Sequence, residues 1–145
     1  MQFLLDRNLP EQLARMLGHY DRAHTVLWLD DRFDKATPDV AWLTAAGDWV
    51  RTGNPTVVVS GDGRILSNEA EAQVLAGQPL SFFHFAPAWL HLGWREMAWK
   101  AVKVWPEIVA NSQPPRPTIY TVPISATKVE VHCPTSQLGQ QRRRR

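Results

Sequence analysis

Residues 3–13, FLLDRNLPEQL, lead from an apolar segment through an aspartate into a segment with helical spacing. The apolar run Phe3 to Leu5 does not alternate with polar residues, which is typical of a strand buried on both faces. Asn8 and Glu11 form an Asn-x-x-Glu capping pattern, which predicts that a helix begins here. The stretch therefore predicts a strand, a short loop and a helix, and it leaves Asp6 at the carboxyl end of the strand.

Strand and helix patterns continue to alternate after this stretch. The further predicted strands are HTVLWL (24–29), TVVVS (56–60) and LSFFHF (80–85). Between the strands, apolar residues recur at helical spacing, at Leu9, Leu13, Met16 and Leu17, at Val40, Leu43, Ala46 and Val50, and at Ala70, Val74 and Leu75. This order predicts βαβ units with right-handed crossovers, and thus an α/β fold around a mainly parallel sheet.

The C-terminal part of the chain has a different pattern. A longer helix is expected from about His91, and Pro106 should kink or end it. The segments TIYTVP (118–123) and TKVEVHC (127–133) alternate apolar with polar residues and predict a small C-terminal hairpin or two edge strands. We therefore expect one domain over residues 1–133. Residues 134–145 are polar and end in four arginines, which predicts a disordered basic tail, solvated or in contact with nucleic acid or a partner.

Composition narrows the class of protein. A chain of 145 residues has the usual size of one domain, and an apolar content of 44% argues against disorder over most of it. Cys133 is the only cysteine, which excludes an intrachain disulfide and a C-x-x-C site. No segment approaches the roughly 18 apolar residues of a membrane span, and Asp6 comes too early for a signal peptide. We expect a cytoplasmic protein that does not contact a membrane.

Three aspartates follow three successive predicted strands. Asp6 ends the first strand, Asp39 lies at the start of the helix after the second, and Asp62 follows the third by two residues. In an open parallel sheet the carboxyl ends of the strands form one edge, where ligands bind. Carboxylates gathered there repel one another unless a cation lies between them, and Mg²⁺ and Mn²⁺ prefer such oxygen ligands. The pattern predicts a metal site for phosphoryl transfer or nuclease chemistry.

Each of these positions also has a structural interpretation. Thr37 is a plausible N-cap with Pro38 at the first helical position, so that Asp39 would complement the helix dipole. Asn68 and Glu71 repeat the Asn-x-x-Glu capping pattern. Asp62 lies between two glycines and could be a turn residue. Capping does not explain Asp6, so the metal hypothesis rests on the three aspartates together.

Other kinds of site are not matched. The chain has no G-x-x-x-x-G-K-[ST], no G-x-G-x-x-G and no H-E-x-x-H, and no G-x-S-x-G surrounds Ser60. The five histidines show no ligand spacing, and His84 is interpreted as a core or rim residue rather than a catalytic one. Asp30, Asp31 and Asp34 lack the pattern of a calcium loop and are interpreted as a solvated loop.

Three motifs in this order resemble a known family. They are D-x-N-x-P from Asp6, T-P-D-x-x-W from Thr37 and S-G-D from Ser60. Together with FFHFAPAWLHLGWREMAWKAVKVWPEI (82–108), they are similar to the PIN-like domains related to VapC-type toxin ribonucleases, over about residues 2–131. The resemblance implies a three-layer α/β fold and an RNA-cleaving site that holds Mg²⁺ or Mn²⁺.

Matching positions imply specific roles. Asp6, Asp39 and Asp62 form the metal set, and Glu71 is a fourth catalytic candidate. For binding RNA, we expect contributions from Asn8, Arg7 and Arg64. The family commonly has a glutamate where this chain has Arg7, a cation that could hold substrate phosphate or weaken metal binding.

The resemblance also implies partners, namely RNA as substrate, a cognate antitoxin and, as in many such toxins, a second copy in a homodimer. Two alternatives stay open. One is a catalytically inactive PIN-like module that binds a partner protein or nucleic acid, and the other is a structure-specific DNA nuclease.

Overall fold

The computed structural model describes residues 1–139, in which strands and helices alternate through the first four strands. The strands are β1 (Gln2–Leu5), β2 (Thr25–Trp28), β3 (Thr56–Ser60), β4 (Ser81–Phe85), β5 (Thr118–Val122) and β6 (Glu130–Pro134). The α-helices are α1 (Glu11–Tyr20), α2 (Asp39–Arg51), α3 (Arg64–Ser67), α4 (Glu69–Ala76) and α5 (Trp94–Ala110). Short 3-10 helices are η1 (Leu29–Asp31), η2 (Pro87–His91) and η3 (Thr135–Gln137).

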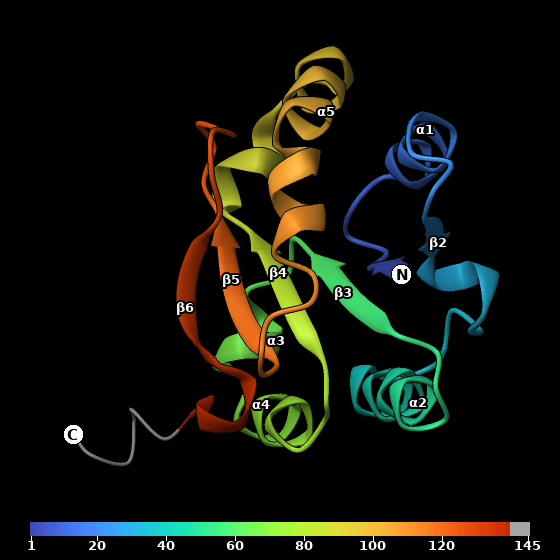
Figure 1. The fold of residues 1–145 in the computed structure, drawn as a ribbon, viewed down its shortest axis with the longest axis vertical. Coiled ribbons are helices and arrows are strands. Elements are labelled where there is room, and N and C mark those ends of the chain that lie inside the picture. The colour runs from blue at the N-terminus through green and yellow to red at the C-terminus, as the bar shows by residue number, and fades with distance from the viewer. Residues whose placement is uncertain (140–145) are drawn as a thin grey trace.

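The six strands form one sheet in the order β2-β1-β3-β4-β5-β6. Neighbours from β2 to β5 are parallel, and β6 is antiparallel to β5 (Figure 1). The predicted mainly parallel α/β fold is confirmed. The two C-terminal strands extend this sheet, since β5 pairs with β4 and β6 pairs with β5, so that of these two strands only β6 is an edge strand.

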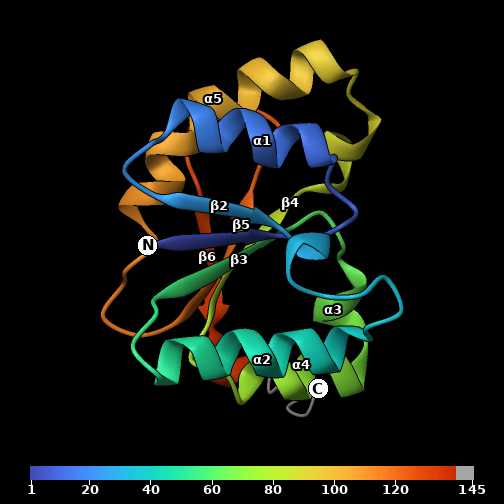
Figure 2. The same cartoon turned by 90° about the vertical axis from the view of Figure 1, so that its right-hand side faces the viewer.

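Helices cover both faces of the sheet and make a three-layer molecule. Figure 2 shows α1 and α5 on one face and α2 and α4 on the other. The strand residues alternate between the two cores, so Phe3 and Leu5 pack with one layer and Leu4 with the other. An apolar run that does not alternate therefore corresponds to a strand buried on both faces, as the sequence predicted.

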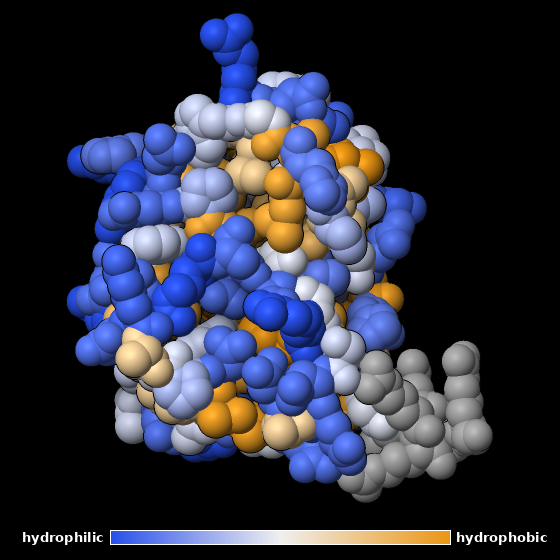
Figure 3. Space-filling view, turned by 180° about the vertical axis from the view of Figure 1, so that it is seen from behind, coloured by the Kyte–Doolittle hydropathy of each residue, from blue (hydrophilic) through white to orange (hydrophobic). Residues whose placement is uncertain are grey.

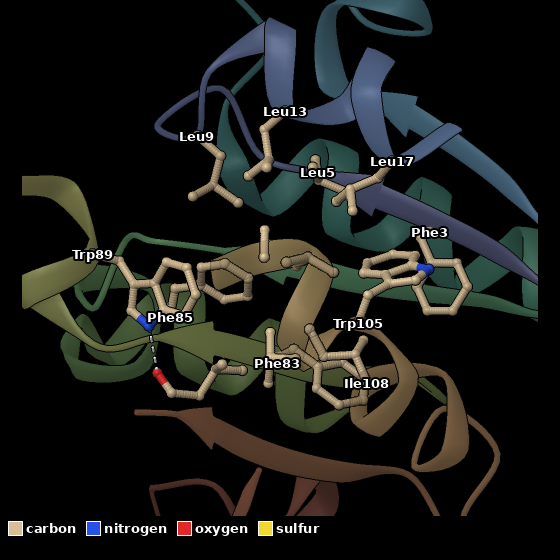
Figure 4. Packing of buried hydrophobic residues seen from close by; sticks show 14 of the residues in the cluster. Phe3, Leu5, Leu9, Leu13, Leu17, Phe83, Phe85, Trp89, Trp105 and Ile108 are labelled. Atoms are coloured by element: carbon tan, nitrogen blue, oxygen red, sulfur yellow. Dashed lines mark hydrogen bonds between the residues drawn. The ribbon is translucent and has the colours of Figure 1, made fainter. Parts of the chain in front are cut away.

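The core between α1, α5 and the sheet is rich in large side chains. Leu13 and Leu17 of α1 face this core with Trp105 and Ile108 of α5, all four buried (Figure 4). Trp89 lies in the same cluster, and its Nε1–H donates to the Val122 carbonyl at 3.0 Å. This packing holds α1 and α5 against one face of the sheet.

The helix α5 differs from the expectation at both ends. It begins at Trp94 after the separate turn η2, and it continues through Pro106 to Ala110. Proline removes one backbone hydrogen bond, but Trp105 just before Pro106 and Ile108 two residues after it are buried in the core, and their packing maintains the helix. Of the two outcomes predicted for Pro106, an end of the helix is therefore wrong, and a kink stays a prediction.

The predicted boundary at residue 133 comes too early. Pro134 belongs to β6, and Thr135 is fully buried, with its hydroxyl donating to the Leu80 carbonyl at 2.7 Å. Leu138 is also buried against the α2 and α4 side of the sheet. The predicted disordered tail over 134–145 is thus wrong for its first residues, and its remainder, 140–145, lies outside the described residues. Within residues 1–139, no helix is both long enough and apolar enough to cross a membrane.

Candidate active site

The four predicted carboxylates lie at the edge of the sheet where the parallel strands end. Asp6 directly follows β1, Asp62 follows β3 by two residues, Asp39 is the first residue of α2, and Glu71 lies in the first turn of α4. Figure 3 looks onto this side of the molecule, where hydrophilic residues form a band across the middle with apolar surface above it. The structure therefore brings the side chains together as the topology predicted.

Asp6 is the most buried of the four, with 5% of its surface exposed. Its Oδ2 accepts a hydrogen bond from the Ser60 hydroxyl at 3.0 Å, and its Oδ1 accepts one from the Arg7 backbone N–H at 2.6 Å. Burial, with smaller contributions from the charges of Asp39 and Asp62, raises the pKa of Asp6 to about 6 despite these two bonds. A buried carboxylate with like charges around it is stabilised by a nearby cation.

Asp62 is paired with Arg64. The guanidinium donates through Nε to Oδ1 at 2.9 Å and through Nη2 to Oδ2 at 3.0 Å, and the Arg64 backbone N–H also donates to Oδ1 at 2.9 Å. These bonds hold the pKa of Asp62 below its usual range. The Arg64 side chain is 85% exposed while that of Asp62 is 12% exposed, so solvent screens the ion pair and it contributes little stability. In this arrangement Arg64 occupies the carboxylate oxygens of Asp62 that would bind a metal ion.

Asp39 and Glu71 interact with each other and with Asp62. Partial burial and then the charges of Asp39 and Asp62 raise the pKa of Glu71. Asp39 accepts a hydrogen bond from Trp42 Nε1 at 2.8 Å, which orients its carboxylate. The Asn68 side chain caps α4 by accepting the Glu71 backbone N–H at 3.1 Å, so the capping interpretation of Asn68 is confirmed. That cap uses the backbone of Glu71 and leaves its carboxylate facing the other acids.

Two predicted helix starts are wrong, and one of them concerns the site. Asn8 does not cap α1, because Pro10 is the N-cap and no side chain bonds to the first turn. The Asn8 Oδ1 instead accepts the Gly61 backbone N–H at 3.0 Å, which ties the loop after β1 to the loop after β3. Likewise Pro38, not Thr37, is the N-cap of α2, without a side-chain bond. Asn8 thus supports the loops that carry Asp6 and Asp62.

Arg7 points to η1 and to the loop that follows it. Its Nε donates to Asp30 Oδ1 at 2.7 Å and its Nη2 donates to the Asp34 carbonyl at 3.0 Å. This loop was interpreted as solvated, but Asp30 is largely buried in its ion pair with Arg7. Arg7 therefore anchors a segment next to the site, and its contribution to RNA binding stays a prediction.

Ser60 is a site residue that sequence reasoning missed. It is fully buried at the end of β3, where its hydroxyl donates to Asp6 and accepts the Asp62 backbone N–H at 3.0 Å. Its position as the last residue of an apolar strand, beside the strand that ends at Asp6, is the signal that could have found it. Ser60 connects the first and third aspartates through one side chain.

The four acidic side chains offer the type of ligand atom that a hard divalent cation prefers. All four acidic side chains offer oxygen, and the pKa values of Asp6 and Glu71 are raised first by burial and then by the negative charges of their neighbours. Their present arrangement is looser than a metal site, since within residues 1–139 no three His, Cys, Asp or Glu side chains are grouped closely enough to hold an ion. The carboxylates of Asp6 and Asp62 are instead bound by Ser60 and Arg64.

Sequence comparison identifies a family for the part of the chain that contains these residues. A family model described as a PIN-like domain matches residues 1–87. The match runs from β1 into η2 and includes Asp6, Asp39, Asp62 and Glu71. No curated protein and no solved structure matches the chain.

Proposed function

Because the chain belongs to the PIN-like domain family, we propose that it is a metal-dependent endoribonuclease that serves as the toxin of a toxin–antitoxin pair. PIN-like domains are often nucleases, and their fold is of a nuclease type. The observation that carries the proposal is the buried Asp6, whose pKa the neighbouring Asp39 and Asp62 help to raise. Its substrate would be RNA, and its partner a cognate antitoxin.

In this proposal Asp6, Asp39 and Asp62 hold Mg²⁺ or Mn²⁺. The metal would supply the charge that lowers the pKa of a water molecule and stabilises the phosphorane-like transition state. Ser60 orients the carboxylate of Asp6 by its hydrogen bond, and Asn8 holds the loops of Asp6 and Asp62 together. Glu71, whose pKa burial and the neighbouring carboxylates raise, would accept or donate a proton near the same edge.

The test is cleavage of single-stranded RNA by purified protein with Mn²⁺ and with EDTA. Asp62→Asn should lower the metal-dependent rate by more than about 100-fold, because even residues behind metal ligands typically contribute 10–100-fold. Asp48→Asn is the matched control, since Asp48 lies on α2 in an exposed ion pair with Arg51. Unchanged cleavage by Asp62→Asn would refute the assignment, and parallel digests of single-stranded and duplex DNA would reveal a DNA nuclease.

A second candidate function is a catalytically inactive PIN-like module that binds a protein or nucleic acid partner. The ion pair between Arg64 and Asp62 favours it, because it occupies both carboxylate oxygens. Calorimetry with Mn²⁺ separates the two candidates. Binding that grows tighter in Arg64→Ala supports the nuclease, whereas no heat of binding in either well-folded protein supports the inactive module.

A further inference from the structure

His84 lies at the same edge of the sheet as the acidic residues. It is the fourth residue of β4, and its register partner on β3 is Ser60. Ser60 in turn bonds to the Asp6 carboxylate and to the Asp62 backbone N–H. The imidazole therefore belongs to the strand end that adjoins the loop carrying Asp62.

One ring nitrogen of His84 is buried without a hydrogen bond. Within residues 1–139, Nε2 is shielded from solvent and has no partner. Buried polar atoms in folded proteins are nearly always paired, so an unpaired one calls for a partner in another state of the site. Nε2 faces Gly63, where a Cβ would lie only 3.4 Å from it. The missing partner must therefore come from the loop of Gly61 to Gly63 or from a ligand that this loop binds.

The nearest charged group from that loop is the Asp62 carboxylate. The negative charge of Asp62 raises the pKa of His84, against the larger lowering effect of burial, and His84 in turn lowers the pKa of Asp62. Asp62 now bonds to Arg64, whose side chain is mostly exposed and whose hold is screened by water. If the Asp62 carboxylate released Arg64, the unpaired Nε2 of His84 would lie next to the loop that carries Asp62.

We propose that His84 is a positioning residue for Asp62. Its Nε2–H donates a hydrogen bond to the Asp62 carboxylate when that carboxylate turns away from Arg64 toward the other acids. The bond fixes one oxygen of Asp62 and leaves the other to face Asp6 and Asp39. The inference rests on the proposed metal-dependent function, because it gives Asp62 the orientation of a ligand. Gly63 contributes by leaving room for the ring, and a side chain there would press on it.

The first test needs no metal. In Arg64→Ala, two-dimensional proton–nitrogen spectra of the imidazole side chains should show the proton of His84 on Nε2, with a hydrogen-bonded N–H signal. That signal should be lost when Asp62→Ala is added, and His84→Gln assigns it by its absence. A proton found on Nδ1 instead, or a His84 spectrum that ignores Asp62→Ala, would overturn the proposal.

The second test measures Mn²⁺ affinity by calorimetry. Gln keeps an N–H donor at the distance of Nε2 and Leu does not, so His84→Leu should weaken binding by about 10-fold or more while His84→Gln binds like the wild type. His19→Gln, on the exposed side of α1, is the control and should change nothing. Equal affinities for the Leu and Gln variants would contradict the proposal, and thermal melts confirm that both are folded.

The two tests separate this inference from the proposed function. If neither the wild-type protein nor Arg64→Ala binds Mn²⁺, the nuclease proposal fails, but the spectra of Arg64→Ala still decide whether His84 bonds to Asp62. If Mn²⁺ binds and both His84 variants bind it equally, the nuclease proposal stands and the role of His84 is refuted.

Discussion

At the scale of single residues, Asp6 combines burial with negative neighbours. Its carboxyl has a pKa of about 6 in the folded chain against an ordinary value of 3.8. The folded state therefore binds more protons than the unfolded state between these two values. As pH rises from about 4 to about 6, this group lowers the free energy of unfolding, by at most about 3 kcal/mol.

Asp6→Asn should remove this pH dependence. In EDTA at pH 7, the variant should be more stable than the wild type by about 1–2 kcal/mol, because a buried charge without a cation is gone. Below pH 4 the two proteins should unfold alike. Urea unfolding at several pH values measures the difference in free energy of unfolding between the two proteins. The contributions of other titrating groups are the same in both and cancel in this difference. A wild type that gains stability relative to the variant as pH rises would contradict the raised pKa.

At the scale of elements, two asparagines with the same sequence pattern have different structural roles. Asn68 caps α4, whereas Asn8 reaches across to the Gly61 backbone and leaves α1 uncapped by a side chain. The difference arises because Asn8 lies in the loop after β1, and the loop after the adjacent strand β3 offers a competing N–H donor.

Substituting each asparagine with alanine should separate these roles. Asn68→Ala should cost about 1 kcal/mol through the lost cap. Asn8→Ala should cost about 1–2 kcal/mol by leaving the Gly61 amide unpaired, and it alone should speed hydrogen exchange at that amide. Urea unfolding and amide exchange by NMR measure both effects. Faster exchange in the first turn of α1 with an unchanged Gly61 amide would show that Asn8 is a cap after all.

The proline inside α5 gives a third prediction. Pro106 is exposed and has no N–H to donate to the Val102 carbonyl, while α5 continues for another turn. Pro106→Ala should therefore raise the free energy of unfolding by about 1 kcal/mol, part of the helix penalty of proline being offset by its effect on the unfolded chain. Glu107→Ala, at the next exposed position, should change it little. A loss of stability in Pro106→Ala would mean that the ring itself packs usefully.

At the scale of the whole molecule, the segment after β6 closes the layer of α2 and α4. Thr135 bonds to the Leu80 carbonyl just before β4 and to the Pro117 carbonyl just before β5. Leu138 then packs into the core below. The end of the described chain therefore makes hydrogen bonds to the starts of two strands, β4 and β5, that lie earlier in the sequence.

Truncation tests this closure. A chain ending at Cys133 should lose at least about 2 kcal/mol of stability, from a buried hydrogen bond and a buried leucine. A chain ending at Gly139 keeps every described contact and should unfold like the full chain. Circular dichroism during urea unfolding compares the three. Equal stability of the 133-residue chain would mean that η3 only rests on the surface.

The sequence by itself determined the layers of the fold and the edge of the site. Apolar runs such as FLL and TVVVS specify strands buried on both faces, and their alternation with helical patterns leads to a parallel sheet whose strands end together. The placement of Asp6, Asp39 and Asp62 at this edge follows from that topology, because Asp6 and Asp62 come just after strand ends and Asp39 begins the helix that follows β2. These inferences depend on the local periodicity of apolar residues, which can be read from the sequence without knowledge of the tertiary contacts.

Only the tertiary structure decided which groups contact one another. Asn8 bonds to Gly61, Arg7 to Asp30 and Thr135 to Leu80, and each partner lies more than 20 positions away in the chain. The capping pattern at Asn8 and the polar composition after residue 133 were misleading for the same reason. A side chain with several hydrogen-bonding options takes the one that the packed neighbours offer, and those neighbours are set by the folded sheet rather than by adjacent sequence.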